Sequence, residues 1–227
     1  MEAVTTIDEV VARLEDLDRT LSPSDGVRWF NRLYLEVTIA VRAYVRDRPL
    51  QAPPFLERLD VFFGNAYFAA SDAAEGHPQD VARAWAPLFE RRADPRIAPL
   101  QFALAGMNAH INHDLAMGVV ATCQTLGMEP DAPQHHDYDA VNVVLRETEG
   151  RVKRWLLTDA LKELDHAVGD ADDAAAIWSI TRARDAAWVR AQVLWRLRDD
   201  PELASAYLEV NDRATELAGR AMLLALP

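Results

Sequence analysis

The sequence has a single cysteine, Cys123, among 227 residues. It therefore cannot form a disulfide framework within the chain, nor a metal site built from several thiolates. Glycine is also scarce, with nine residues, and strand-like alternation of apolar and polar residues is missing. Because alanine, leucine, arginine and glutamate dominate instead, we expect helices throughout and almost no sheet.

Long apolar runs and an excess of basic residues are absent as well. The most apolar segment, WFNRLYLEVTIAV at 29–41, is interrupted by polar residues and is shorter than the roughly 20 apolar residues that a bilayer crossing needs. The formal net charge of -12 argues against binding to nucleic-acid phosphates or anionic membranes. The N-terminus MEAVTTIDEVVARLEDLD is acidic where a signal peptide would be basic. We therefore expect a soluble, cytoplasmic protein without nucleic-acid or membrane partners.

The sequence does contain a series of helical segments separated by proline-marked connections. A length of 227 residues, half of them hydrophobic, suits one domain with one core. The expected helices cover about 6–21, 25–47, 54–75, 79–91, 97–128, 135–166, 173–198 and 201–225. We predict an all-α, single-domain bundle (1–227) of about seven or eight helices around a central helix at about 97–128.

The predicted central helix contains the most unusual segment, GMNAHINHDLAMG at 106–118. No Lys, Arg or Glu lies between Ile97 and Gly127, so this helix has no charged face for solvent and we expect it to be buried. At about 100° per residue, one side carries His110, His113 and Asp114, and another side carries Gln101, Asn108 and Asn112. A buried polar group without a partner costs on the order of 1–3 kcal/mol. We therefore expect protein groups, water, a metal or a ligand to satisfy these side chains.

A divalent metal site is one interpretation of these residues. His110 and Asp114 are one helical turn apart, a spacing at which both can bind one ion. Asp60 projects from an aromatic stretch and Asp139 lies near the start of the segment 135–166, so both are further candidate ligands. His110, His113 and Asp60 are the candidate catalytic acids and bases. A hydrogen-bonded core network is the alternative interpretation of the same side chains.

Other polar and aromatic residues are predicted to line a pocket beside these groups. Asn108 and Asn112 belong to the central helix, and Tyr67 follows Asp60 on the same helical face. In the segment 173–198, tryptophans recur at spacings of three and four. This stripe, which includes Asp185 and Trp188, is typical of core packing but also suits a wall facing a small-molecule ligand.

Four segments together resemble a known family. They are RWFNRLYLEVT at 28–38, LDVFFGNAYFAA at 59–70, PLQFALAGMNAHINHDLA at 99–116 and DYDAVNVVL at 137–145. These segments are similar to a family of uncharacterised, mainly actinobacterial proteins catalogued as domain of unknown function 5995, and NAHINHDL is the most specific part. The resemblance spans about 25–200 and implies no known activity, so it assigns no catalytic residue.

Three functions are compatible with these features. The first is metal-assisted hydrolysis, in which a divalent ion would lower the pKa of a bound water. The second is a metal-independent acid/base enzyme, a cyclase or isomerase, which would hold an apolar ligand in an aromatic cavity beside the histidines. The third is a non-catalytic binding or scaffold module, in which removing His110 or Asp114 would lower the melting temperature by several degrees.

Overall fold

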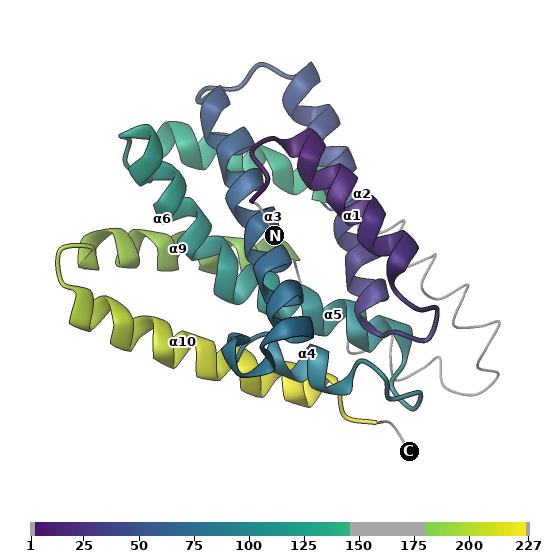
Figure 1. Cartoon of the computed structure of the whole chain (residues 1–227). Helices are drawn as coiled ribbons and strands as arrows, with labels where there is room; N and C mark the ends of the chain where they lie inside the picture. Colours follow the sequence, from purple (N-terminus) through teal and green to yellow (C-terminus); the bar gives the residue numbers. More distant parts are fainter. Residues whose placement is uncertain (1–2, 146–179, 226–227) are drawn as a thin grey trace.

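The computed structural model describes residues 3–145 and 180–225, and these form helices joined by turns, without a strand (Figure 1). The predicted all-α fold is therefore confirmed. The helices are α1 (Ile7–Thr20), α2 (Val27–Asp47), α3 (Pro53–Gly76), α4 (Ala86–Arg91), α5 (Pro99–Ala109), α6 (Leu115–Leu126), α9 (Ile180–Leu197) and α10 (Pro201–Met222). Residues 132–145 are helical as well.

Capping residues set several of the helix ends. The Thr6 hydroxyl accepts from the Glu9 backbone N–H, and Glu9 reaches back to the Thr6 backbone N–H, so a capping box starts α1. Asp200 accepts from Leu203 N at 3.1 Å and starts α10. Gly127 ends α6 with a positive φ of 64°, which glycine adopts without a steric penalty.

The predicted helix at 79–91 is wrong. A short 3-10 turn occupies Pro78–Asp80, and α4 begins only at Ala86. Pro87 explains the break, because a proline has no N–H to bond the fourth preceding carbonyl and its ring would clash with that carbonyl. Proline is tolerated in the first turn, so the helix starts there. The irregular segment before it places Trp85 in the core.

The helix predicted from about 135 begins three residues earlier, at 132. Asp137 is therefore not in its first turn. Its carboxylate instead accepts from the backbone N–H groups of Gln51 at 2.9 Å and Ala52 at 2.6 Å, directly before α3. Asp137 thus stabilises the start of another helix. The end of the helix predicted at 135–166 and the start of that predicted at 173 lie outside the described residues.

The central helix consists of α5, a π-helical turn (η2, His110–Asp114) and α6, which follow one another without a break (Figure 1). It packs against α2, α3, α9 and α10, and most of its side chains are buried, as predicted from its lack of charge. Contact with α2 is very close at Gly106, where a Cβ atom would lie 2.3 Å from the Phe30 ring. None of the helices within the described residues combines the length and apolar character that a membrane crossing requires.

Candidate functional site

The predicted histidines and aspartate lie on an irregular turn of the central helix. The segment His110–Asp114 is a π-helix, in which backbone hydrogen bonds span five residues instead of four. Such turns are rare and occur frequently at functional sites. The irregular backbone thus coincides with the residues that the sequence singles out.

His110 and Asp114 form a buried hydrogen-bonded pair. His110 Nδ1 lies 3.0 Å from Asp114 Oδ2, and Trp85 Nε1 donates to the same oxygen at 3.1 Å. Burial lowers the pKa of His110 well below its usual range. Burial also raises the pKa of Asp114 well above its usual range, although the Trp85 hydrogen bond acts in the opposite direction. The imidazole is therefore uncharged at neutral pH, and Asp114 engages its Nδ1.

Aromatic side chains enclose the His110 ring. Phe63 stacks on it with 3.4 Å between ring centroids, and Tyr34 meets it edge-on at 4.5 Å. His110 Nε2 is buried, and within the described part of the chain it has no hydrogen-bond partner. A buried polar atom of this kind destabilises the fold by about 1–3 kcal/mol. It calls for an ordered water, a ligand or a catalytic role as its explanation.

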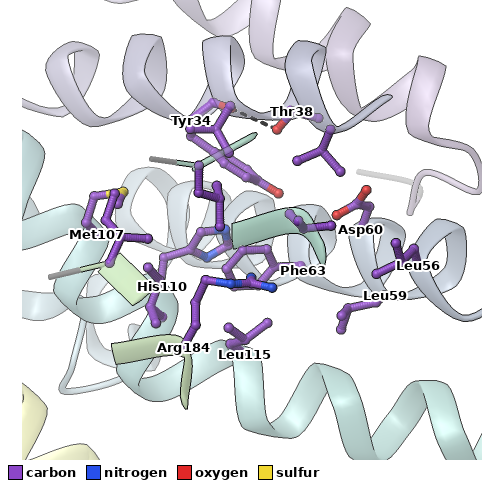
Figure 2. Close-up of a pocket in the computed structure, with 16 residues that line it drawn as sticks. Tyr34, Thr38, Leu56, Leu59, Asp60, Phe63, Met107, His110, Leu115 and Arg184 are labelled. Carbon is purple, nitrogen blue, oxygen red and sulfur yellow. Dashed lines mark hydrogen bonds between the residues drawn. The ribbon is translucent and has the colours of Figure 1, made fainter. Parts of the chain in front are cut away.

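His110 lines a cavity, together with residues of several helices (Figure 2). The volume of this cavity is about 50 Å³. The described walls come from α2, α3, the central helix, the segment 132–145 and α9, and most of their side chains are apolar. The polar lining residues are Tyr34, Thr38, Asp60, His110 and Arg184. Since one water needs roughly 10–15 Å³, the cavity has room for several waters or a small organic group.

Asp60 is the carboxylic acid among the described lining residues. Its Oδ2 is buried and, like His110 Nε2, has no hydrogen-bond partner in the described part of the chain. Burial raises the pKa of Asp60 to about 7, whereas the positive charge of Arg184 acts to lower it and Glu57 acts to raise it. Near neutral pH the carboxyl group is therefore divided between its acid and its carboxylate. We call His110 and Asp60 the cavity pair.

Arg184 lines the same cavity, although the sequence did not single it out as a site residue. Its Nε donates to Asn142 Oδ1 at 2.8 Å, and its Nη2 donates to the Tyr138 carbonyl at 2.9 Å. A signal was present in the sequence, because Arg184 is the charged member of an otherwise apolar stripe along α9. The buried residues of this helix are Ile180, Arg184, Ala187, Trp188, Ala191 and Leu194.

His113, the third predicted catalytic residue, does not line the cavity. Its Nδ1 lies 3.3 Å from Asp212 Oδ1 on α10, and its Nε2 lies 3.9 Å from Asp114 Oδ1. Burial lowers the pKa of His113, while the Asp212 carboxylate acts to raise it. His113 can therefore influence a ligand in the cavity only through Asp114.

The predicted pocket residues Asn108 and Asn112 hold α10 against the central helix instead. Asn108 Nδ2 donates to the Thr215 backbone carbonyl at 2.9 Å, and the backbone carbonyl of Asn112 accepts from Asn211 Nδ2 at 2.7 Å. Gln101 on the same side donates to two carbonyls at the end of α10. We call Gln101, Asn108 and Asn112 the amide face. We expect its function to be structural, because each amide is satisfied: Gln101 and Asn108 donate to carbonyls at α10, and Asn112 bonds to Asn108 and to Arg190 of α9.

The structure places the other four candidates away from the cavity lining. Tyr67 is buried and donates to Asn31 Oδ1 at 3.3 Å. Trp188 is buried and stacks against His135, while Asp185 is exposed on α9. Asp139 lies 3.3 Å from His135 Nε2 with 45 % of its side chain exposed.

The four predicted metal ligands are not gathered around one point. Asp60 lines the cavity, Asp139 is half exposed elsewhere, and the facing atoms of His110 and Asp114 share a hydrogen bond. Within residues 3–145 and 180–225, no three His, Cys, Asp or Glu side chains lie close enough together to hold a metal ion. The spacing of His110 and Asp114 predicted that both could bind one ion, whereas in the structure the two side chains bond to each other at 3.0 Å.

Comparison with known proteins identifies a family without a known reaction. A family model described as "Family of unknown function (DUF5995)" matches residues 7–225, which is nearly the whole chain. No curated protein and no solved structure matches the sequence. The chemistry of the site must therefore be inferred from its own geometry.

Proposed function

The chain belongs to the family of unknown function DUF5995, and we propose that it is an acid/base enzyme that isomerises or cyclises a small, largely apolar molecule without a metal. One observation carries this proposal. The two members of the cavity pair line one apolar cavity, and each keeps a buried polar atom without a partner among the described residues. Acid/base catalysis needs such groups, one to give and one to take a proton at the same ligand.

The proposed role of His110 is proton transfer through Nε2. Its Nδ1 is bonded to Asp114 Oδ2, and Trp85 holds that carboxyl group from the other side. A carboxyl group on one imidazole nitrogen fixes the ring orientation and determines which nitrogen meets the ligand. In this proposal Asp114 and Trp85 are positioning residues, and Nε2 is the atom that exchanges a proton with the ligand.

Asp60 is proposed as the second acid or base. A pKa of about 7 leaves both its protonated and ionised forms available near neutral pH, which is where a proton-transfer group is most effective. The side chain lies on α3, one turn before Phe63, whose ring stacks on His110. The same helix therefore supplies the second proton-transfer group and the wall that packs against the first.

The surrounding walls support an apolar ligand. Leu56, Leu59, Ile111, Leu115 and Val141 line the cavity together with Phe63 and other hydrophobic side chains. In such surroundings water solvates charge poorly, so proton transfers to and from a ligand are governed by the few polar groups present. Mostly apolar pockets with a small number of convergent polar groups are typical of small-molecule sites.

An assay that does not require the natural substrate to be known tests this proposal. We would incubate the protein, treated with EDTA, in D2O with a panel of two- to four-carbon carbonyl compounds, neutral and anionic, and follow exchange of the hydrogens next to the carbonyl by NMR. General acid/base catalysis contributes roughly 100-fold or more. We therefore expect exchange by the wild type and its loss in His110→Gln and in Asp60→Asn.

The matched control is His136→Gln, which changes an exposed histidine outside the cavity lining. It should exchange like the wild type. Equal rates in His110→Gln and the wild type, or loss of exchange on EDTA treatment, would overturn the proposal.

Metal-assisted hydrolysis has a separate test. It would need further ligands besides His110 and Asp114, which the described residues do not place nearby. Elemental analysis of protein purified at neutral pH without a histidine tag decides between the two enzymes. One divalent ion per protein molecule would support metal-assisted hydrolysis, whereas trace amounts of metal would argue against it.

A further inference from the structure

Arg184 is the feature of the cavity that acid/base chemistry does not explain. Its side chain enters from α9 and lines the cavity, while 7 % of the residue is exposed (Figure 2). Arginine is always charged at physiological pH and is rarely buried unless it is paired. The question is which negative charge balances it.

Within residues 3–145 and 180–225, the partners of this guanidinium group hold it in place but carry no charge. Nε and Nη2 donate to Asn142 Oδ1 and to the Tyr138 carbonyl, both of which are uncharged acceptors. The guanidinium carbon lies 4.0 Å from the centre of the Tyr138 ring, and the Tyr138 hydroxyl donates back to the Arg184 carbonyl at 2.8 Å. No acidic side chain of the described residues forms an ion pair with Arg184, which donates through Nε and Nη2. Among the described residues, a fixed and buried cation at the cavity wall is therefore without a counter-charge.

Asp60 is an internal candidate for a counter-charge, since it lines the same cavity and Arg184 affects its titration. The two side chains do not form an ion pair, however, and Asp60 keeps Oδ2 without a partner. Burial raises the pKa of Asp60 to about 7 in spite of Arg184, so the protonated form of the carboxyl group is available near neutral pH. Asp60 therefore does not act as a permanent counter-ion.

We propose that the cavity binds the carboxylate group of a small monocarboxylic acid, which pairs with Arg184 while its apolar remainder packs between the walls. This inference rests on the proposed function, because it names the class of molecule that the same cavity takes. The planar guanidinium group matches a carboxylate in shape and charge. When Asp60 is protonated, it can donate to the ligand and does not repel it.

The lining also distinguishes a carboxylate from a phosphate. Arg184 is the cationic side chain among the described lining residues, because the His110 imidazole is uncharged. A dianion would therefore retain an unbalanced charge in apolar surroundings, whereas a monoanion would not. The volume of about 50 Å³ is a third of that of an engineered cavity of about 150 Å³ that binds benzene, so roughly two to four carbon atoms fit.

Calorimetric titration with butyrate and with its neutral isostere butyramide tests the carboxylate contact. We expect the wild type to bind butyrate at least 10-fold more tightly than butyramide. Arg184→Gln should lose this preference, since the remaining contacts are the same for both probes. Arg190→Gln is the matched control, because Arg190 lies on the same helix and bonds to Asn112 outside the cavity lining, and it should keep the preference.

A second titration with octanoate tests whether the ligand is a longer acid, of which only the carboxyl end enters the cavity. Tighter binding of octanoate than of butyrate, with the same dependence on Arg184, supports the carboxylate contact and assigns a longer chain. Arg184→Gln also removes the bonds to Asn142 and Tyr138, so its circular dichroism melt must be checked. If that variant does not fold, the wild-type preference for butyrate over butyramide decides.

The outcomes separate this inference from the proposed function. Equal affinity for butyrate and butyramide, or a preference that survives Arg184→Gln, overturns the carboxylate inference and leaves the acid/base proposal standing. Arg184-dependent binding of butyrate without any proton exchange supports the carboxylate inference and overturns the acid/base proposal. No binding of butyrate, butyramide or octanoate overturns the inference and removes the cavity as a ligand site.

Discussion

The two polar sides of the central helix have opposite hydrogen-bonding states. On the amide face, Asn108 donates to α10 and Asn112 bonds to Asn108 and to Arg190 of α9, so each side chain has a partner. On the other side, His110 faces a cavity together with Asp60 of α3, and each keeps a buried atom without a partner among the described residues. Burial is similar for Asn108 and His110, which are 2 % and 1 % exposed. Burial alone therefore does not separate a structural polar residue from a functional one.

The difference between the two sides is one of energy. A satisfied buried amide contributes to stability, and removing it leaves its partner unsatisfied. An unsatisfied buried group opposes folding, and removing it relieves that cost. Removing a satisfied amide should therefore lower the free energy of unfolding, whereas removing an unsatisfied buried charge should raise it. Measuring both changes tests the comparison directly.

Asn108→Ala should produce the largest effect. The substitution leaves the Thr215 carbonyl without its donor and the Asn112 side chain without its acceptor. We expect the free energy of unfolding to fall by about 2–4 kcal/mol, and the melting temperature to fall by about 5–15 °C. Urea denaturation measures the first quantity and calorimetry the second. A loss below about 0.5 kcal/mol would mean that the amide face does not hold α10.

Asp60→Asn should change stability in the opposite direction at pH 8. The pKa of Asp60 is raised in the folded protein to about 7, so between the unfolded value of 3.8 and about 7 the folded state binds more protons than the unfolded state. Stability attributable to Asp60 is therefore highest at low pH and is lost as the pH rises to about 7. Each pKa unit corresponds to about 1.4 kcal/mol, and because cavity water solvates part of the carboxylate we expect the variant to gain about 1–3 kcal/mol at pH 8.

The pH dependence provides the check on Asp60→Asn. Urea denaturation of both proteins between pH 4 and pH 8 should show the advantage of the variant shrinking as the pH falls. Glu75→Gln, an exposed change on the same helix, should have little effect at any pH in this range. If the variant is less stable than the wild type at pH 8, the Asp60 carboxyl group stabilises the fold and its role is structural.

The sequence predicted the central helix well because the relevant signal is local. The absence of Lys, Arg and Glu between Ile97 and Gly127 indicated burial, and the spacing of His110 and Asp114 placed both on one side of the helix. The long-range partners of the amide face could not be predicted, since Asn108 donates to Thr215 of α10, 107 residues away, and Asn112 accepts from Arg190 of α9, 78 residues away. No local pattern specifies such a pairing, so Asn108 and Asn112 were assigned to the pocket.

The prediction missed Arg184 for a related reason. Its place in the apolar stripe of α9 was visible, but only the packing of α9 against the central helix brings it to the cavity. The helix predicted at 79–91 failed on a local effect, the position of Pro87, that was available in the sequence. Local errors of this kind are correctable, whereas the identity of long-range partners requires the structure.

Asp137→Ala tests whether satisfied carboxylates elsewhere behave like the amide face. Asp137 accepts from two backbone N–H groups, of Gln51 and Ala52, before α3. Replacing a capping carboxylate by alanine costs about 1–2 kcal/mol, so we expect a smaller loss than for Asn108→Ala. Hydrogen exchange should accelerate at the amides of Gln51 and Ala52. Unchanged exchange there would show that the carboxylate does not hold the start of α3.

The smallest effect should come from a partnered group that is not buried. Arg213 pairs with Glu209 one turn earlier on α10, and both side chains are more than half exposed. Water solvates both charges in the folded and the unfolded chain, so Arg213→Ala should cost no more than about 0.5 kcal/mol. Urea denaturation at low and at high salt measures this, and the difference from wild type should shrink with salt. A loss in the free energy of unfolding as large as that of Asn108→Ala would mean that a paired group stabilises the fold regardless of its burial. A small loss would show that pairing stabilises the fold mainly where water is excluded.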